Sequence, residues 1–427
     1  MSELEHGAPG ASDDGERVGT AETALRGARR RRVDGGAYGL PPGASNPLLT
    51  RVGPGTPCGE FMRRYWQPVG VSSMVGTTPK KVRVLGEDLV LFRDRRGRAG
   101  LLHARCCHRG TTLYYGRVED EGIRCCYHGW LFDVRGQCLE QPCEPGGGLR
   151  RHKVRQPWYP VQERYGLVFA YMGPLDRMPA LPRYDTLEQL GPGEFLEQDT
   201  MSFYTGGPME VDSCAPFNWL QNFENVMDSY HVLILHSRFT GIQFRKEFDI
   251  MPKVEWSLLD HGVAARSLRP LPDGGVFDRI TQVLLPNIRI VPSIQLTRGQ
   301  GREVAWLVPI DDTHHRSYGV ARVSEPGLYT SRSRHADHNG KMWGEMNEEE
   351  HQRFPDDYEA QLGQGEITFH NEEHLATSDK GVILLRKLLT QEVRRVAAGG
   401  DPAGFTQDES RSVVRVRAGN FLPDRPD

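Results

Sequence analysis

The chain has 427 residues, a net charge of −3 at pH 7 and 38% hydrophobic residues. This length allows two or three domains with a substantial core. The balanced charge argues against a dedicated nucleic-acid-binding or membrane-surface protein, and no apolar run approaches the ~20 residues that span a bilayer. We therefore expect a cytoplasmic protein with neither nucleic acid nor membrane among its partners.

The first 46 residues predict a tail rather than a folded domain. They are rich in Gly, Ala, Asp and Glu and include the arginine run 29–32. No apolar segment follows the arginines, so the stretch does not resemble a secretion signal. An arginine run could bind nucleic acid, but this composition is more typical of a solvated disordered tail. We predict that residues 1–46 are disordered.

Residues 47–175 predict a small all-β domain. The stretch KKVRVLGEDLVLFRDRRGRAGLL (80–102) alternates apolar and polar residues around two turns, which indicates consecutive hairpins. Residues 165–173 have the pattern of a buried strand that ends in glycine. The proline-bearing segment 174–185 is the candidate domain boundary.

Residues 176–427 predict a larger domain of mixed structure. Residues 218–236 have helical periodicity, because apolar residues recur there every three or four positions. Two strand regions and two further helices follow, at 276–296, 302–323, near 355–364 and from Ser378 to Gly399. The fold class is therefore α+β, with an all-β domain followed by a mixed one.

Two cysteine–histidine pairs lie close together in the first domain. Cys106-x-His108 and Cys125-x-x-His128 are separated by 16 residues, so each pair can occupy the tip of one hairpin loop. Two thiolates on one iron and two imidazoles on the other are the ligands of a Rieske [2Fe–2S] cluster. Zinc is the alternative, but zinc fingers of this composition keep the cysteines together and the histidines together. We predict a [2Fe–2S] cluster.

A second cysteine follows the first in each pair. A ligand set built on Cys107 would use two adjacent residues, whose side chains point to opposite faces of an extended loop. We therefore expect Cys107 and Cys126 to be buried neighbours of the cluster and not its ligands.

The cysteine–histidine motif, with YHGW at its end and LFDVRGQCLEQP (131–142) after it, closely resembles the Rieske domain of ring-hydroxylating oxygenases. The stretch 50–70 is similar to the start of the phthalate dioxygenase type. The resemblance covers about residues 48–405. It implies a terminal oxygenase alpha subunit, whose catalytic domain has an antiparallel sheet flanked by helices (helix-grip, START-like) and holds mononuclear non-haem Fe(II).

Asp228-x-x-His231-x-x-x-x-His236 is the predicted place of that iron. Two histidines and one carboxylate on one face commonly hold non-haem Fe(II) and leave positions open for O2. On an ideal helix His231 and His236 are about 140° apart, so the helix must bulge, unwind or end between them. The resemblance implies that Asp228 is not a ligand. It would bridge His231 to His128 of the partner subunit.

The residues alone leave the third iron ligand open. The stretch 355–387 resembles the C-terminal stretch of the phthalate dioxygenase group, and this resemblance implies Asp357, with Asp356 as the adjacent misassignment. The rivals for metal binding lie in a segment that has the pattern of a strand leading into a turn, and they are Asp311, Asp312, His314 and His315. A hydrogen-bonding role near a helix start is expected for His370, Glu373 and His374. Arg238 could reach an anionic substrate or be an ordinary surface arginine.

The resemblance implies a multicomponent Rieske mono- or dioxygenase of aromatic catabolism. An NAD(P)H-dependent reductase, with or without a ferredoxin, would reduce the cluster, and O2 would be used to hydroxylate a carboxylated aromatic substrate. O-demethylation of a methoxylated lignin-derived acid is the alternative, and Phe369 departs from an acidic residue common in the group. An electron carrier or iron–sulfur sensor is a further alternative. A bridge between subunits predicts a homotrimer or a dimer of trimers, since a heterologous contact closes into a ring.

Overall fold

The structure is a computed structural model that describes residues 40–200, 214–240, 244–294, 297–330, 340–341 and 343–422. Residues 44–427 form one unit of the chain and residues 1–43 form another. Residues 1–39 of the predicted tail lie outside the described residues, whereas residues 40–46 are described and Asn46 caps a helix. None of the described helices combines the length and the apolar character that a membrane crossing would require.

The helices begin where the sequence supplies caps. Asn46 and Thr56 accept backbone N–H groups at the starts of α2 (Pro47–Thr50) and α3 (Pro57–Arg63), and each helix has proline in its first turn. The longest helix is α10 (Lys380–Ala397), which buries one face at intervals of three and four residues. Besides short 3-10 turns, the other described helices are α4 (Asp185–Glu188), α5 (Trp219–Asn225), α6 (His231–Ile234), the π-helix η7 (Leu235–Phe239), α8 (Glu348–Arg353) and α9 (Asp357–Leu362).

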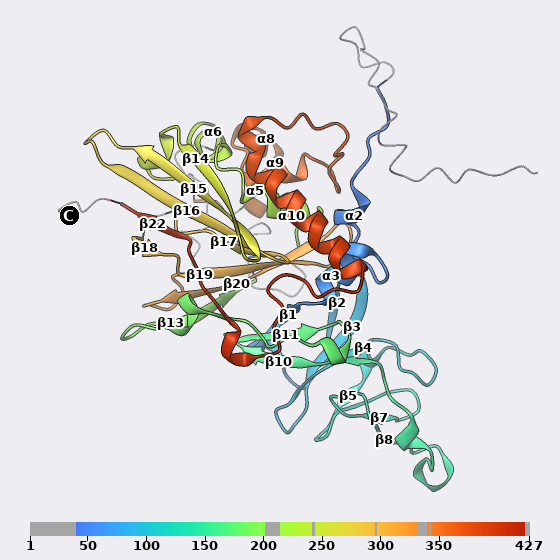
Figure 1. Ribbon diagram of the computed structural model, residues 1–427. Coiled ribbons are helices and arrows are strands. Elements are labelled where there is room, and N and C mark those ends of the chain that lie inside the picture. The colour runs from blue at the N-terminus through green and yellow to red at the C-terminus, as the bar shows by residue number, and fades with distance from the viewer. Residues whose placement is uncertain are drawn as a thin grey trace, which may run out of the picture. The chain divides into compact units, whose positions relative to one another are not determined.

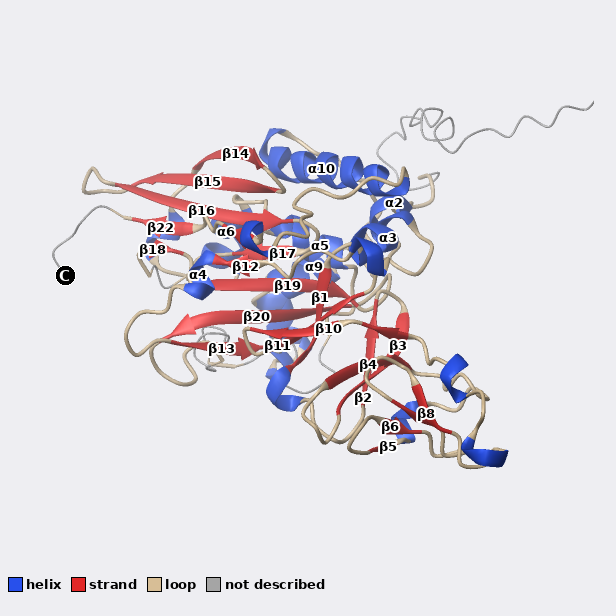
Figure 2. Ribbon diagram, turned by 60° about the horizontal axis from the view of Figure 1, so that its bottom comes forward, coloured by secondary structure: helices blue, strands red, loops and turns tan. Residues whose placement is uncertain are grey.

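The larger part of the chain is built on an antiparallel sheet. Among the described residues it runs in the order β13-β20-β19-β17-β16-β15-β14, and β22 joins β16 to β18. The strands are β13 (Phe195–Asp199), β14 (Lys253–Leu259), β15 (Gly262–Pro270), β16 (Val276–Leu284), β17 (Ile288–Ile290), β18 (Gly299–Gln300), β19 (Glu303–Pro309), β20 (His315–Val323) and β22 (Gly419–Phe421). In both ribbon views α10 runs beside β14 and β15 (Figures 1 and 2). The expected sheet flanked by helices is confirmed.

The predicted all-β region forms three small sheets. Their strand orders are β1-β11-β10, β2-β3-β4-β9 and β5-β6-β7-β8, and β12 pairs separately with β21. The strands are β1 (Trp66–Val71), β2 (Lys80–Val84), β3 (Glu87–Arg93), β4 (Ala99–His103), β5 (Arg117–Val118), β6 (Ile123–Arg124), β7 (Leu131–Phe132), β8 (Cys138–Glu140), β9 (Trp158–Tyr159), β10 (Val161–Arg164), β11 (Leu167–Tyr171), β12 (Arg183–Tyr184) and β21 (Val413–Val414). The consecutive hairpins expected over 80–102 are β2, β3 and β4, and every residue of β11 is buried, as its apolar run indicates.

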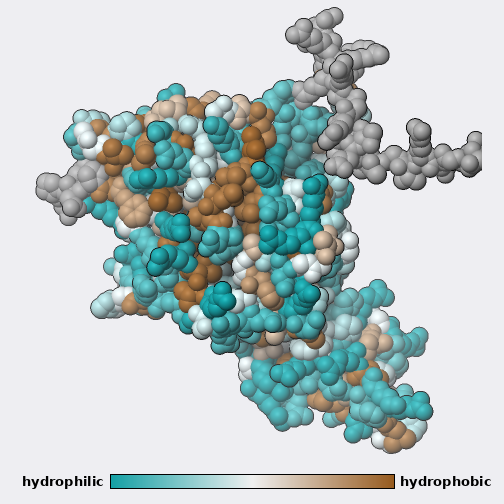
Figure 3. All heavy atoms as spheres, in the orientation of Figure 1, coloured by the Kyte–Doolittle hydropathy of each residue, from teal (hydrophilic) through white to brown (hydrophobic). Residues whose placement is uncertain are grey.

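The two largest hydrophobic cores hold the sheets of these parts. The larger core joins α2, α3 and the β1-β11-β10 sheet to α10 and the large sheet, so residues on both sides of position 175 share it. The smaller core lies under β5–β8 and contains the side chains of Cys106 and Cys125. On the face seen in Figure 3, the lobe of β5–β8 is covered mainly by hydrophilic residues, whereas hydrophobic residues gather over the centre of the larger part. The stability of the β5–β8 lobe therefore depends on a small hydrophobic core and on the hydrogen bonds of its turns.

Candidate metal centres

Two hairpin loops of the same design, 106–111 and 125–130, carry the predicted cluster ligands. In each loop the N–H of the leading cysteine donates to the carbonyl five positions later, at 2.9 Å in both cases. A glycine four positions after the cysteine, Gly110 or Gly129, donates back to the cysteine carbonyl and has a φ of 79° or 73°. Because L side chains rarely adopt this φ, glycine is required there. The two loops therefore close in the same way and present their side chains to each other.

The four predicted cluster ligands meet between these loops. Cys106 and Cys125 are buried, and the rings of His108 and His128 lie 4.5 Å apart at an interplanar angle of 71°. Trp130 stacks on His108 at 4.3 Å, which holds that ring in place. Burial raises the pKa of the Cys125 thiol, so a bound metal is needed to keep it as a thiolate. A pair of buried sulfurs beside a pair of imidazoles fits a [2Fe–2S] cluster.

The spacing of these ligands also argues against one zinc ion. Among the described residues, the group whose ligand atoms all lie within 4.8 Å of one another is His231, His236 and Asp357. The four loop side chains form no such group, although one tetrahedral ion would require it. A cluster of two irons divides the ligands between two metals, which suits the wider arrangement.

Cys107 and Cys126 were expected to be buried, and this expectation is wrong. Both side chains are exposed. The N–H of Cys107 donates to Gln156 Oε1 at 2.7 Å, which fixes the loop backbone just after the inward-pointing Cys106. Cys107 lies in a turn and not in an extended segment, and its exposed side chain remains a neighbour of the Cys106 thiol.

The second candidate centre brings together residues from two helical segments. Nε2 of His231 and Nε2 of His236 lie 3.6 and 3.5 Å from Oδ1 of Asp357. His231 is the first residue of α6, His236 lies in η7, and Asp357 is the first residue of α9. The N–H of Thr240 donates to Leu235 O, five positions earlier, in the wide turn of a π-helix. The α-helix thus ends between the two histidines and continues as a π-helix, which meets the requirement set by their spacing.

An aspartate faces the Nδ1 atom of each histidine in this centre. Asp356 Oδ1 lies 3.0 Å from Nδ1 of His236, and Asp228 Oδ2 lies 3.4 Å from Nδ1 of His231. A carboxylate at Nδ1 keeps the proton on that atom and leaves the Nε2 lone pair free for a metal. Asp228 therefore places a negative charge beside His231 without a hydrogen bond to its Nδ1, and its role in orienting that ring stays a prediction. Its contact with the partner subunit's His128 stays a prediction.

Opposing charges dominate the electrostatics of the second centre. Burial lowers the pKa of His236, but the carboxylates of Asp357 and Asp356 outweigh burial and raise this pKa to about 10. Burial raises the pKa of Asp357, but the positive charges of His236 and His231 outweigh it and hold this pKa below its ordinary value. Asn225 Nδ2 also donates to Asp357 Oδ1 at 3.0 Å. The carboxylates that retain a proton on His236 would equally favour a divalent cation.

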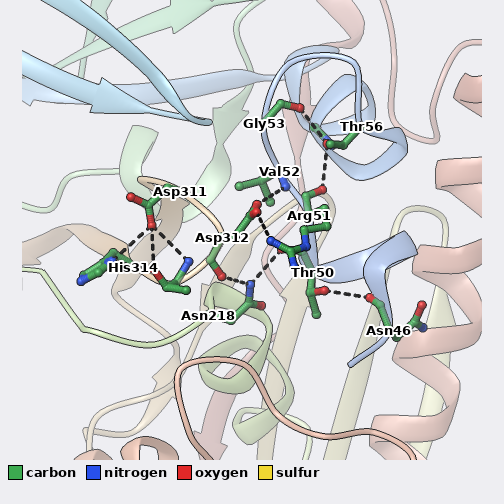
Figure 4. A network of polar contacts seen from close by, with 12 residues as sticks. Asn46, Thr50, Arg51, Val52, Gly53, Thr56, Asn218, Asp311, Asp312 and His314 are labelled. Carbon is green, nitrogen blue, oxygen red and sulfur yellow. Dashed lines mark hydrogen bonds and ion pairs between the residues drawn. The ribbon is translucent and has the colours of Figure 1, made fainter. Parts of the chain in front are cut away.

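The rival aspartates serve the structure of a turn instead (Figure 4). Asp312 accepts the N–H of Val52 at 2.8 Å through Oδ1 and pairs with Arg51 at 2.7 Å through Oδ2. Asp311 Oδ1 lies 3.2 Å from His314 Nδ1 and also accepts a backbone N–H of the turn. These contacts tie the N-terminal segment to the β19–β20 turn, so the hydrogen-bonded interpretation of this segment is confirmed.

His315 is a core residue that holds α5 against β20. Its side chain is fully buried, Nδ1 lies 2.9 Å from Phe217 O, and Nε2 lies 3.0 Å from Asn222 Nδ2. A neutral ring with its proton on Nδ1 satisfies both contacts. Burial lowers the pKa of His315 to about 4, so the neutral form is kept at ordinary pH.

The remaining polar candidates lie outside both centres. His370 Nδ1 accepts the N–H of Asn46 at 3.1 Å, and Glu373 pairs with Arg386 at 2.8 Å, so their expected hydrogen-bonding role is confirmed. Arg238 is 59% exposed and lies 3.9 Å from Asp249, as an ordinary surface arginine does. The contacts of Asn225 and Asp356 with the second centre were not predicted from the sequence. The adjacent pair of aspartates was the one signal for Asp356.

Comparisons with known proteins agree with this geometry. Residues 65–160 match the model of the Rieske [2Fe-2S] domain. The chain is 55% identical over 387 residues to the phenoxybenzoate dioxygenase subunit alpha of Ectopseudomonas oleovorans, a match that covers 91% of this chain and 94% of that one. It is 39% identical over 399 residues to the tert-butanol monooxygenase / tert-amyl alcohol desaturase oxygenase subunit of Aquincola tertiaricarbonis, covering 88% and 80%. The crystal structure of dicamba monooxygenase bound to dicamba superposes with a TM-score of 0.57 over 80% of this chain and 99% of that one, at 16% identity, which is a likeness of fold.

The fold and the two centres define an oxygenase that relays electrons from an iron–sulfur cluster to a mononuclear iron. The chain belongs to the Rieske non-haem iron ring-hydroxylating oxygenases, as the oxygenase component of a multicomponent system. Its cofactors are a Rieske [2Fe–2S] cluster and a mononuclear iron. The predicted family, fold class and cofactors are confirmed, and the zinc protein and electron carrier alternatives are wrong.

Proposed function

We propose that this terminal oxygenase hydroxylates a carboxylated aromatic compound, and that aryl ether acids of the phenoxybenzoate class are its first candidate substrates. The observation that carries the proposal is the group of His231, His236 and Asp357, whose ligand atoms lie within 4.8 Å of one another in a chain that also has a Rieske domain. The substrate class is supported by the relative named phenoxybenzoate dioxygenase subunit alpha. Electrons would come from an NAD(P)H-dependent reductase, directly or through a ferredoxin.

We assign the ligands residue by residue. The cluster would be held by Cys106, His108, Cys125 and His128, and the mononuclear iron by His231, His236 and Asp357. When bound, the cluster supplies single electrons and the mononuclear iron activates O2. The residues around them orient the ligands: Asp356 holds a proton on Nδ1 of His236, Asp228 places its charge 3.4 Å from Nδ1 of His231, and the amide of Asn225 holds Oδ1 of Asp357 at 3.0 Å.

We further propose that Asp228 links the two centres across subunits. Its Oδ1 accepts the N–H of Tyr230 at 2.9 Å, its Oδ2 faces His231, and its side chain remains one-third exposed at 33%. The exposed edge is free to meet His128 of the partner subunit in a homotrimer or a dimer of trimers. In Asp228→Asn we expect both metals to be retained, while re-oxidation of the reduced cluster by O2 and substrate slows at least tenfold. Sedimentation of the wild-type protein as a monomer would contradict this part of the proposal.

The function can be tested by reconstitution. The purified oxygenase is combined with NADH and a surrogate reductase of a related system, and O2 uptake is followed with phenoxybenzoate, with a methoxybenzoate and with no substrate. We expect phenoxybenzoate to stimulate O2 uptake and one or both atoms of labelled O2 to enter the product. Formaldehyde release from the methoxybenzoate alone would instead identify an O-demethylase. Uptake that no aromatic acid stimulates would contradict the proposed substrate class.

A further inference from the structure

Two arginines lie on the inner face of the large sheet. Arg269 on β15 is 1% exposed and Arg279 on β16 is 6% exposed. Arg269 pairs with Phe277 and Arg279 with Ser267 in the strand register, so the two guanidinium groups are diagonal neighbours on one face. The face of β15 that carries Arg269 also buries an alanine and a valine. A strand position that faces the protein interior normally carries an apolar residue. Two adjacent buried cations therefore require an explanation.

The contacts of these arginines leave positive charge uncompensated. Arg279 donates to neutral acceptors, Asn420 Oδ1 and Pro292 O, at 2.7 Å each. Nε and Nη1 of Arg269 are buried without a hydrogen-bond partner, and no carboxylate of the described residues forms an ion pair with Arg269. An unpaired buried charge is costly, and a guanidinium stays protonated at neutral pH. The site therefore has donors and charge for an anion.

Electrostatics agree with this description. Burial lowers the pKa of Arg269 to about 10. Burial and then the positive charge of Arg269 lower the pKa of Arg279 to about 9, and Glu303 offsets this only in part. Both side chains nevertheless remain cations at pH 7. An anion between them would relieve their mutual repulsion.

A continuous row of aromatic rings connects these arginines to the second metal centre. His236 stacks on Phe244 at 4.3 Å, and Phe244 contacts Phe248 at 5.2 Å. The Phe248 ring in turn lies 5.4 Å from the guanidinium of Arg269 and 5.1 Å from that of Arg279. A predicted iron ligand and the buried cations thus face the same aromatic row. Rings of this kind are a suitable wall for an aromatic substrate.

We propose that Arg269, supported by Arg279, binds the carboxylate of the aromatic substrate and so orients the ring toward the mononuclear iron. This inference rests on the proposed function and deepens it by naming the residues that select an acid. The planar guanidinium of Arg269 suits a carboxylate, and the phenylalanines beside it exclude water from the pair. Arg238, the arginine that the sequence suggested, is exposed and lies outside this proposal.

A purely structural role is the competing explanation. Phe248 and Phe277 lie 5.4 and 5.8 Å from the Arg269 guanidinium, and cation–π attraction to these rings could by itself retain the arginine. The two roles differ in what they predict for ligands. A structural arginine affects acids and neutral analogues alike, whereas an anion-binding arginine affects only acids.

The test measures binding to the oxidised holoenzyme under anaerobic conditions by isothermal titration calorimetry. The probes are meta-phenoxybenzoate and the neutral meta-phenoxybenzamide. In Arg269→Met we expect the Kd of the acid to rise about 30-fold or more, since removing one partner of a buried charge pair has at least this effect, and the Kd of the amide to change less than about twofold. Arg269→Lys keeps the charge and should retain part of the affinity for the acid.

The matched control is Arg266→Met on the same strand. Arg266 lies on the outer face in an exposed ion pair with Asp278, so its removal should leave both affinities unchanged. Iron content and the cluster spectrum report whether each variant is folded. If Arg269→Met does not fold, Arg269→Lys decides: selective weakening of the acid supports the proposal, and equal weakening of acid and amide overturns it.

The outcomes separate this inference from the proposed function. A wild-type protein that oxidises phenoxybenzoate, but whose Arg269→Met variant binds the acid as tightly as before, would overturn the arginine assignment alone. A wild-type protein that binds neither probe would overturn both, because the assignment requires an acidic aromatic substrate.

Discussion

The cluster loops and the mononuclear centre are assembled in opposite ways. All four candidate cluster ligands lie between Cys106 and His128, in two loops closed by the same backbone hydrogen bonds. The mononuclear centre takes two histidines from α6 and η7 and its carboxylate from α9, much later in the chain. The first centre is therefore determined by local turns and the second by tertiary packing. Their responses to mutation should differ accordingly.

Packing around the second centre shows how this dependence arises. Thr240 Oγ1, one residue after η7, donates to Pro355 O at 2.6 Å, and Asn225 from the end of α5 reaches Asp357 at 3.0 Å. Buried Gln221 on α5 also donates to Gln361 O on α9 at 2.8 Å. These hydrogen bonds hold α9 against the histidine segment. A change to any of them should loosen the iron without affecting the cluster.

The largest effect is expected in the cluster loops. Cys106→Ala removes a candidate iron ligand and a buried side chain of the small core under β5–β8. We expect complete loss of the visible cluster spectrum and no O2 uptake, because three remaining ligands cannot hold a [2Fe–2S] cluster. Absorption and electron paramagnetic resonance spectra of the anaerobically purified variant provide the measurement.

The neighbouring cysteine is the matched control. Cys107→Ala changes an exposed thiol, so the cluster spectrum and the activity should remain those of the wild type. Loss of the cluster in Cys107→Ala, with retention in Cys106→Ala, would reverse the ligand assignment.

A moderate effect is expected from the carboxylate behind His236. Asp356 both caps α9 and faces Nδ1 of His236 at 3.0 Å. Asp356→Asn keeps a capping side chain but removes the charge, so the affinity for Fe(II) should fall about 10- to 100-fold while the cluster is unaffected. Competition with a ferrous chelator measures this affinity.

Asp312→Asn provides the comparison for this substitution. Asp312 is also an aspartate at a turn, but its contacts are with Arg51 and the Val52 N–H and not with the metal centre. Its variant should bind Fe(II) as the wild type does. Equal affinities in Asp356→Asn and the wild type would show that Asp356 acts only as a helix cap.

The smallest effect concerns the pH dependence of stability near the second centre. The pKa of folded His315 is lowered to about 4, so the unfolded chain binds a proton near its ordinary pKa while the folded chain does not. Stability is therefore fully present above that ordinary value and is lost as pH falls from it toward 4. We expect a loss of roughly 2 kcal/mol between pH 7 and pH 5.

Thermal unfolding of the wild type and of His315→Gln at these two pH values checks this expectation. The variant is less stable at pH 7 but should lose less on acidification. Parallel losses in the two proteins would show that other groups control the acid sensitivity.

The contrast between local turns and tertiary packing also explains which ligands could be predicted from the sequence. The cluster ligands could be predicted because the two cysteine–histidine pairs are close together in the sequence. The helix had to bulge, unwind or end between His231 and His236, and α6 ends at Ile234, where η7 begins at Leu235. By contrast, the spacing of residues could not select Asp357 over other carboxylates, because only tertiary packing brings α9 to the histidines. Resemblance to a family supplied that residue.

Other features had no reliable signal in the sequence. The exposure of Cys107 and Cys126 depends on which of two adjacent cysteines points inward, and the surrounding structure decides this. Arg269 and Arg279 occupy strand positions whose alternation could have marked them as inward-facing, but one strand does not show which face is covered. Their proposed role in binding the substrate depends on the row of aromatic rings that connects them to His236.

The most direct measurement is the iron and acid-labile sulfide content of Asp357→Ala beside that of the wild type, both purified anaerobically. The two-centre account predicts about three irons and two sulfides per wild-type chain, since a Rieske cluster contributes two of each. The variant should contain about two of each and keep an unchanged cluster spectrum. Loss of the cluster in this variant, or retention of the third iron, would contradict the account.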